Sequence, residues 1–172
     1  MHSIILGITG TGKTTLAKKL SNQTQRKVVV LEPFNTGGWN SNAYFAQDAD
    51  EVLAIAQSNK NLDIFIDESA ETLCRDNAFQ FLATRSRQYG HRVFFIAQRA
   101  SQILPVIRNN CETVYCFRQS KKDAEIIAND LADDCFLQCA KLSKGECIVK
   151  IGCDGKPQKY KIFSPQKVKR KK

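Results

Sequence analysis

The residues best suited to chemistry lie near the start of the sequence, in the stretch ILGITGTGKTTLAKKL at positions 5–20. Gly7, Gly12, Lys13 and Thr14 fit the pattern G-x-x-x-x-G-K-[ST], directly after an apolar strand pattern and at the opening of a helical one. In such a loop the glycines let backbone N–H groups surround phosphates, the lysine reaches the β- and γ-phosphates, and the hydroxyl ligates Mg²⁺. The stretch therefore predicts a site for ATP or GTP with Mg²⁺.

A pair of carboxylates provides a second candidate site. The apolar run LDIFIDES ends in Asp67 and Glu68. A carboxylate at the end of a strand can hold the Mg²⁺ shell, and a second one beside it can take a proton from an attacking water. Following a phosphate loop, the pair favours hydrolysis over transfer to a second substrate, with Asp67 on the metal and Glu68 as the base. In isolation, a solvated acidic strand end is the alternative.

A third candidate is Gln98, which ends the apolar run HRVFFIAQ. An amide both donates and accepts hydrogen bonds, so Gln98 could bind the γ-phosphate or the attacking water and transmit hydrolysis to the loop that follows. A polar strand end bonded to the backbone is the alternative interpretation.

These sites need a scaffold of alternating strands and helices. Strands that are apolar throughout, as in a buried parallel sheet, are predicted at 3–6, 27–31, 62–66, 93–97 and 113–117. Helical patterns fall at 14–22, 50–58, 70–89 and 121–131. The last of these begins at Ser120, with Asp123 in the capping-box position. The alternation predicts an α/β fold with a mostly parallel sheet.

The C-terminal part follows a different pattern. Segments 146–151 and 160–163 flank CDGKP, whose Asp154-Gly155 pair is a hairpin signal. From position 156 to 172 there are eight Lys or Arg and no Asp or Glu. We expect one domain at 1–163 and a flexible basic tail at 164–172. Such a tail binds phosphates without reading sequence, and a merely solubilising terminus is an equal alternative.

Composition limits the class of protein. A chain of 172 residues with 42% hydrophobic content can bury one core, and 26 Lys and Arg against 17 Asp and Glu make a polyanion a natural partner. Seven cysteines without a C-x-x-C pair indicate reduced, mostly buried thiols and a cytoplasmic location. No apolar run reaches the roughly 18 residues of a membrane span, and a cleavable signal is not evident.

The motifs together resemble a known superfamily. GITGTGKTT, IFIDESAETL, ATRSRQYGHRVFFIAQRASQI and VYCFRQSKKDAEII are similar, in that order, to the HerA/FtsK superfamily of DNA-pumping ATPases. The small size resembles the genome-packaging ATPases of membrane-containing and related icosahedral viruses. The resemblance implies a RecA-like sheet with the Gln98 strand between the P-loop and Asp67 strands. It also implies a ring, with six subunits, that hydrolyses ATP to pump DNA into a preformed capsid and contacts capsid or portal-vertex proteins.

The resemblance also implies roles for individual residues. The nucleotide-binding set, which contains the Walker A motif, is Gly7, Thr9, Gly10, Thr11, Gly12, Lys13, Thr14 and Thr15. The metal residues are Thr14 and Asp67, with the Walker B pair at Asp67 and Glu68. The catalytic set is Lys13, Glu68, the sensor Gln98 and an arginine finger, Arg87, that acts on the neighbouring subunit.

Some assignments stay open at this stage. Arg85 is the alternative finger, and either arginine could be an ordinary helix-end cation. The stretch QRAS has Ala100 where the superfamily usually has proline, which predicts a less rigid sensor loop. Arg99, Arg108 and Lys60 are candidates for a DNA-facing pore, but the sequence does not orient them. The loop around Trp39 is a lid, a subunit contact or a plain connection.

Two other functions remain as alternatives to a DNA motor. One is a small P-loop nucleoside or nucleotide kinase, which should carry clustered arginines over the phosphates. The other is a nucleic-acid-binding protein in which nucleotide is a structural ligand, and this would leave Glu68 without a task.

Overall fold

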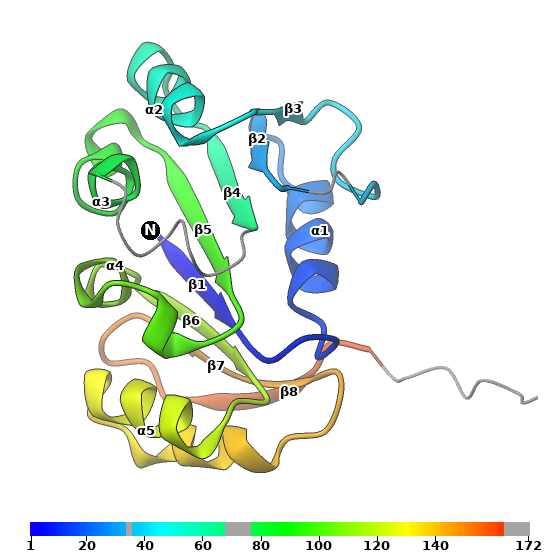
Figure 1. Ribbon diagram of the computed structural model, residues 1–172, viewed down its shortest axis with the longest axis vertical. Helices are drawn as coiled ribbons and strands as arrows, with labels where there is room; N and C mark the ends of the chain where they lie inside the picture. The colour runs from blue at the N-terminus through cyan, green and yellow to red at the C-terminus, as the bar shows by residue number, and fades with distance from the viewer. Residues whose placement is uncertain (34–35, 68–76, 164–172) are drawn as a thin grey trace, which may run out of the picture.

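The computed structural model describes residues 1–33, 36–67 and 77–163 (Figure 1). Its strands are β1 (Ser3–Leu6), β2 (Val28–Leu31), β3 (Tyr44–Phe45), β4 (Asp63–Asp67), β5 (Arg92–Ala97), β6 (Thr113–Phe117), β7 (Glu146–Ile151) and β8 (Gln158–Lys161). Its α-helices are α1 (Lys13–Gln23), α2 (Ala49–Ser58), α3 (Asn77–Thr84), α4 (Pro105–Asn109) and α5 (Lys121–Asp130). Three 3₁₀ segments are η1 (Ser86–Tyr89), η2 (Ala100–Gln102) and η3 (Asp134–Lys141).

All eight strands form one sheet in the order β3-β2-β4-β5-β1-β6-β7-β8. The first six are parallel to their neighbours, while β7 and β8 add an antiparallel hairpin beside β6. The predicted α/β class, with a mostly parallel sheet and a C-terminal hairpin, is confirmed. So is the position of β5 between β1 and β4, which brings the ends of three chemically important strands side by side.

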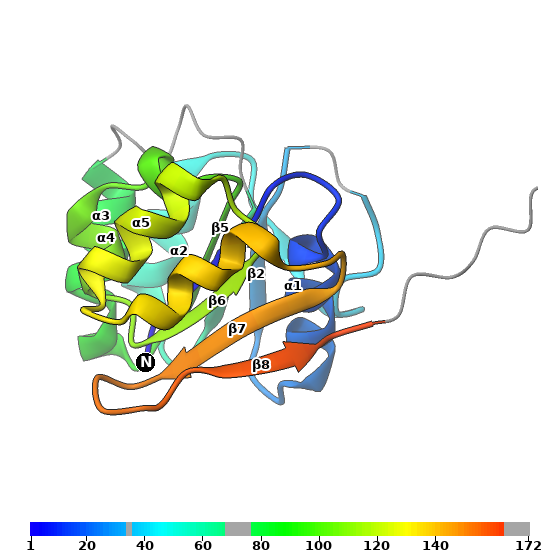
Figure 2. The ribbon, with the colours of Figure 1, turned by 90° about the horizontal axis from the view of Figure 1, so that it is seen from below.

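Two layers of helix cover the sheet. Helix α1 lies alone on one face, and α2 to α5 with η3 lie on the other, as Figures 1 and 2 both show. The larger core lies under α2 to α5 and includes Ile64, Phe79, Phe95 and Phe136, while the smaller one lies under α1. Strands β1 and β2 are buried at every position, as continuous apolar runs predict. None of the helices in the described part of the chain is long and apolar enough to cross a membrane.

The predicted elements differ from the observed ones mainly at their ends. The predicted helix at 70–89 is described only from Asn77, and it breaks after Thr84 into the 3₁₀ turn η1. The last strand was predicted at 160–163 and is observed at Gln158–Lys161. The elements α4, η3 and β3 were not predicted. Segment η3 could have been recognised from its apolar spacing. Phe136, Cys139 and Leu142 recur every three residues, as the buried side of a 3₁₀ helix requires, and all three are buried.

Most of the described cysteines are small core residues, as expected. Cys111, Cys116, Cys139 and Cys147 are buried, and all the described cysteines are free thiols. Burial raises the pKa of Cys111 and of Cys147 to about 12, so these thiols are inert at neutral pH. Cys135 is half-buried, Cys153 is exposed, and Cys74 lies outside the described residues.

Trp39 belongs to the smaller core. Its side chain is 6% exposed, and its ring lies 5.5 Å from that of Phe65. Its indole Nε1 donates to the Glu32 carboxylate at 2.8 Å, which satisfies the only polar atom of the ring. This bond joins Trp39 to the end of β2.

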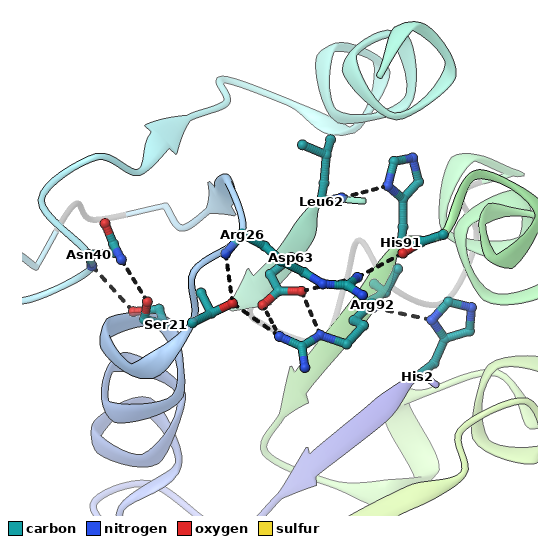
Figure 3. A network of polar contacts seen from close by, with 11 residues as sticks. His2, Ser21, Arg26, Asn40, Leu62, Asp63, His91 and Arg92 are labelled. Carbon is teal, nitrogen blue, oxygen red and sulfur yellow. Dashed lines mark hydrogen bonds and ion pairs between the residues drawn. The ribbon is translucent and has the colours of Figure 1, made fainter. Parts of the chain in front are cut away.

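A buried ion cluster closes the edge of the sheet where the parallel strands begin (Figure 3). Asp63, the first residue of β4, is 1% exposed and binds the Arg92 guanidinium on β5 through both carboxylate oxygens, with Nε donating at 2.7 Å. Arg26 lies 3.9 Å from the same carboxylate. Nearby, His2 Nδ1 accepts from the Val93 N–H at 3.2 Å, and burial lowers the pKa of His2 to about 3, which keeps it neutral.

Replacing Arg92 with Met should destabilise the protein by about 3 kcal/mol, because it leaves the buried Asp63 carboxylate without its bidentate partner. The matched control is Arg26→Met, which removes only the 3.9 Å contact and the hydrogen bond to Gly90 O. We expect this control to cost about 1 kcal/mol or less. Urea unfolding of the three proteins checks the prediction, and equal losses for the two arginines would contradict it.

Candidate functional site

The predicted phosphate-binding loop connects β1 to α1 at the opposite edge of the sheet, where the parallel strands end. Neighbouring strands hold its backbone on both sides. The Gly7 N–H donates to Ala97 O on β5 at 3.2 Å, and the Ile8 N–H donates to Arg118 O just after β6 at 2.9 Å. Within the loop, the Thr11 hydroxyl donates to Ile8 O at 2.7 Å. The loop is thus fixed by the central strands before any ligand contact is considered.

Glycine is required at Gly12 for two separate reasons. Its φ of 122° lies in a region that other residues avoid. An added Cβ would also lie 2.5 Å from the ring of Phe163, which covers this side of the loop. The segment that leads to Phe163 is held by the Ile162 N–H, which donates to Gly145 O at 2.8 Å, and by the Gly145 N–H, which donates to Thr11 O at 3.0 Å. The C-terminal hairpin therefore supports the loop directly.

Lys13 lies inside the loop and is 8% exposed. Its Nζ donates to Ile8 O at 3.3 Å, across the concave side of the turn. Burial lowers the pKa of Lys13, and the negative charge of Asp67 partly opposes that change. The first residue of α1 thus carries its charge to the point where a phosphate chain would meet the N-terminus of the helix.

Thr14 and Asp67 meet where the metal pair was predicted. The Thr14 hydroxyl donates to Asp67 Oδ2 at 2.8 Å, which joins α1 to the end of β4. Burial is the main cause that raises the pKa of Asp67, and the hydrogen bond from Thr14 partly offsets it. Mg²⁺ in nucleotide sites takes one or two protein oxygens together with phosphates and waters. A hydroxyl and a carboxylate in contact fit that requirement.

The remaining ligands of a metal at this point would come from phosphate and water. In residues 1–33, 36–67 and 77–163 there is no cluster of three or more His, Cys, Asp or Glu that could hold an ion by itself. Glu68, the predicted base, lies outside the described residues. Its assignment stays a prediction that depends on its place next to Asp67.

Gln98 directly follows β5, and the structure brings it to the phosphate-binding loop. The Thr9 hydroxyl donates to Gln98 Oε1 at 3.2 Å, and both residues are exposed. Thr9 and Thr14 therefore link one loop to two neighbouring strand ends, through Gln98 and Asp67. The sensor role of Gln98 stays a prediction, and its contact with the phosphate loop is consistent with it.

Arg87 lies far from this site within the same subunit. It is on η1, at the edge where the parallel strands begin, and its guanidinium forms an ion pair with Glu112 at 2.7 Å and donates to Asn110 O at 2.7 Å. The length of the sheet separates Arg87 from its own phosphate loop, and its role as a finger for a neighbouring subunit stays a prediction. Arg85 is also exposed, and no ion pair joins it to a residue in the described ranges.

Two of the three candidates for a DNA-facing pore carry ion pairs. Arg108 has a side chain only 10% exposed, which pairs with Asp130 at 2.5 Å and donates to Ala100 O. This arginine fixes α4 to α5 and is withdrawn from solvent. Arg99 is half-exposed and pairs with Asp123 at 3.1 Å, whereas Lys60 is exposed.

The sequence analysis missed Glu32 as a member of this region. It directly follows β2, and the register that pairs Leu31 with Ile66 places it beside Asp67. Its carboxylate accepts from Trp39 Nε1 at 2.8 Å and from the Thr36 N–H at 3.0 Å, and its charge contributes to the raised pKa of Asp67. The signal was present in the sequence as an acidic residue directly after the buried run VVVL.

Comparison with known proteins places this geometry in context. The family model for the ATPase family associated with various cellular activities (AAA) matches residues 3–119. B204, the DNA-packaging ATPase from Sulfolobus turreted icosahedral virus, has a similar structure, with a TM-score of 0.77 at 12% identity, covering 95% of this chain and 98% of that chain. The genome-packaging NTPase B204 of Sulfolobus turreted icosahedral virus 2, in complex with AMPPCP, gives 0.76 at 10% identity, covering 94% and 97%.

A secretion ATPase shares the fold over a smaller part of its length. The cytoplasmic domain of the Thermomonospora curvata type VII secretion ATPase EccC gives a TM-score of 0.66 at 16% identity, covering 93% of this chain and 25% of that chain. No curated protein has a sequence that matches this chain. At these identities the similarity is one of fold, and it confirms the resemblance from which the RecA-like sheet was expected.

Proposed function

The chain belongs to the ATPase family associated with various cellular activities, and from this premise we propose that it is a DNA translocase that packages a viral genome into a preformed capsid. The observation that carries the proposal is the pair of links from the phosphate loop, Thr14 to Asp67 and Thr9 to Gln98. Because hydrogen bonds join this loop to the ends of β4 and β5, a change from ATP to ADP in the loop can shift both strand ends. Motors need that coupling, whereas a static nucleotide site does not.

We assign hydrolysis to the residues at this edge. The loop and Lys13 bind the β- and γ-phosphates, and Thr14 with Asp67 would hold Mg²⁺, whose charge offsets that of the phosphates. Glu68 takes a proton from water as the water oxygen bonds to the γ-phosphorus and the bond to the ADP oxygen breaks. Gln98 orients that water or the γ-phosphate. The products are ADP and phosphate.

The proposal includes a ring of subunits, six by the resemblance, around DNA. The position of Arg87 at the edge of the sheet opposite its own phosphate loop supports a role at the site of a neighbour. Packaging is preferred over secretion because the viral ATPase B204 has the more similar fold, with a TM-score of 0.77 against 0.66 for the secretion ATPase EccC. Capsid or portal-vertex proteins would then be partners, and the host cytoplasm or the virion the location.

DNA binding should be independent of sequence and should weaken steeply with salt. Residues 164–172 contribute five Lys or Arg, so replacing them with Gln should reduce the slope of log K against log salt by up to about 4.5 for duplex DNA. Binding titrations at several salt concentrations measure the slope. The substitution is preferred to a deletion that reaches Phe163, because this ring covers Gly12.

A second comparison tests the function itself. Random and defined duplexes of equal length should bind equally, and either should stimulate ATP turnover. A strong preference for one sequence would replace the motor with a specific regulator. Transfer of phosphate to a nucleoside instead of water would replace it with a kinase.

A further inference from the structure

A buried carboxylate ties the loop after Gln98 to the start of α5. Asp123 is 0% exposed, although it lies in the first turn of a surface helix. Its Oδ1 accepts from the Ser101 N–H at 3.1 Å and from the Ser101 hydroxyl at 2.8 Å. Its Oδ2 accepts from Arg99 Nε at 3.1 Å and from the Ser120 hydroxyl at 2.5 Å. A single side chain thus receives four hydrogen bonds, three of them from the sensor loop.

The local capping role of Asp123 does not explain this arrangement. The N-cap requires only that Ser120 accept from the Asp123 N–H, which it does at 3.1 Å. In a full capping box the carboxylate would turn back to the N–H of Ser120. Here it turns toward Ser101 and Arg99 instead. Burial alone would raise the pKa of Asp123, but these hydrogen bonds outweigh burial and lower it, so the group is a stable anion.

The loop that Asp123 holds begins at the sensor. Arg99 follows Gln98 directly, and Ala100 is fully buried at the start of η2. Ala100 stands where the superfamily usually has proline, whose ring would fix the backbone by itself. In this chain the carboxylate of Asp123 supplies the restraint from outside the loop. These hydrogen bonds restrain Arg99 and Ser101, and the expectation that Ala100 makes the loop less rigid stays a prediction.

We propose that Asp123 is a positioning residue for Gln98, and that it couples the phosphate loop to α5. The path runs from Thr9 to Gln98 by a hydrogen bond, along the chain to Ser101, and across to Asp123. Within the described residues, the side-chain hydrogen bonds of Asp123 go to Arg99, Ser101 and Ser120 and none goes to the phosphate loop, so we assign it the role of holding the loop that presents the amide. The inference rests on the proposed role of Gln98 as the sensor.

A double-mutant cycle tests this path. Asp123→Asn keeps one acceptor oxygen, but its NH₂ group replaces the oxygen that accepts from Arg99 and Ser120. An NH₂ group cannot accept these two hydrogen bonds. We expect kcat to fall by about 2- to 30-fold, while the dissociation constant for ATPγS changes less than about 2-fold. On a Gln98→Ala background, the same substitution should cause no further loss of kcat, because its route to the chemistry has been removed.

The controls separate positioning from a loss of stability. Asp133→Asn, just beyond the far end of α5, removes an ion pair with Lys150, keeps an oxygen that can cap η3, and should leave kcat unchanged because it does not alter the sensor loop. Ser101→Ala removes one of the three hydrogen bonds from the sensor loop, that of the hydroxyl, and should reproduce part of the loss of kcat. This variant keeps the test available if Asp123→Asn does not fold.

If the kcat of the double mutant falls by the product of the two single-mutant losses, the two residues act independently. That result would overturn the role of Asp123 but not the role of Gln98 as the sensor. An ATPγS affinity that falls as much as kcat would also overturn it. Full turnover in Gln98→Ala would refute the sensor itself, and with it the path proposed here.

Discussion

Glu68→Gln is expected to bind ATP with unchanged affinity and to hydrolyse it about 10²- to 10⁴-fold more slowly, the usual contribution of a general base. The amide keeps the size of the side chain but cannot take a proton from water. Asp67, the residue before it, is fixed at the end of β4 by the hydroxyl of Thr14, so the substitution should leave the metal pair in place. Nucleotide titration and phosphate release measure the two effects separately.

Two matched variants make this result specific. Lys13→Ala should abolish nucleotide binding, since it removes the buried ammonium group of the loop. Glu51→Gln changes a carboxylate on α2 that contacts Tyr44 and Gln47, away from the site, and should leave turnover unchanged. Normal turnover in Glu68→Gln would assign the base to another group.

Arg87→Ala is expected to reduce turnover by about 10³- to 10⁵-fold, the range that arginine fingers contribute elsewhere, while ATP still binds. The cation would stabilise charge on the γ-phosphoryl group of the neighbouring subunit. Mixing Arg87→Ala with Lys13→Ala should restore some activity, because one interface then pairs an intact loop with an intact finger. For the unmodified protein, turnover should rise faster than linearly with protein concentration.

The ion pair of Arg87 provides the control. Glu112→Gln breaks the 2.7 Å contact but leaves the arginine present, so a finger should still work. If Glu112→Gln and Arg87→Ala lose activity equally, the pair has only a structural role within the subunit. Arg85→Ala tests the alternative finger. Full activity of a monomer at high dilution would remove the need for any finger from a neighbour.

The scaffold and the loop were predictable because their signals are local. Parallel strands buried on both faces are continuous apolar runs, and β1 and β6 were predicted at their observed bounds. The phosphate loop is specified by residues 7–14, which are close together in the sequence. Its neighbours follow from topology, since parallel strands bring Asp67 and Gln98 to the same edge as Gly7.

Features that depend on distant partners were not predictable. Trp39 lies in a stretch typical of a surface loop, and its burial depends on Phe65, which comes much later in the chain. Asp123 reads locally as a helix cap, yet three of its four hydrogen bonds come from Arg99 and Ser101. Arg108 reads as a free cation until the fold brings Asp130 to it. Each of these depends on tertiary contacts that periodicity does not encode.

The central place of β1 determines when a newly made chain can first use ATP. Both partners of β1 are synthesised much later, β5 beginning at Arg92 and β6 at Thr113, and the ring that covers Gly12 is later still. Ribosomes add roughly 5 to 20 residues per second, so β1 waits on the order of 5 to 20 seconds for its first neighbour. We expect a nascent chain to have no affinity for nucleotide until its last strands have left the ribosome. Its apolar first strand is exposed to chaperones throughout that interval.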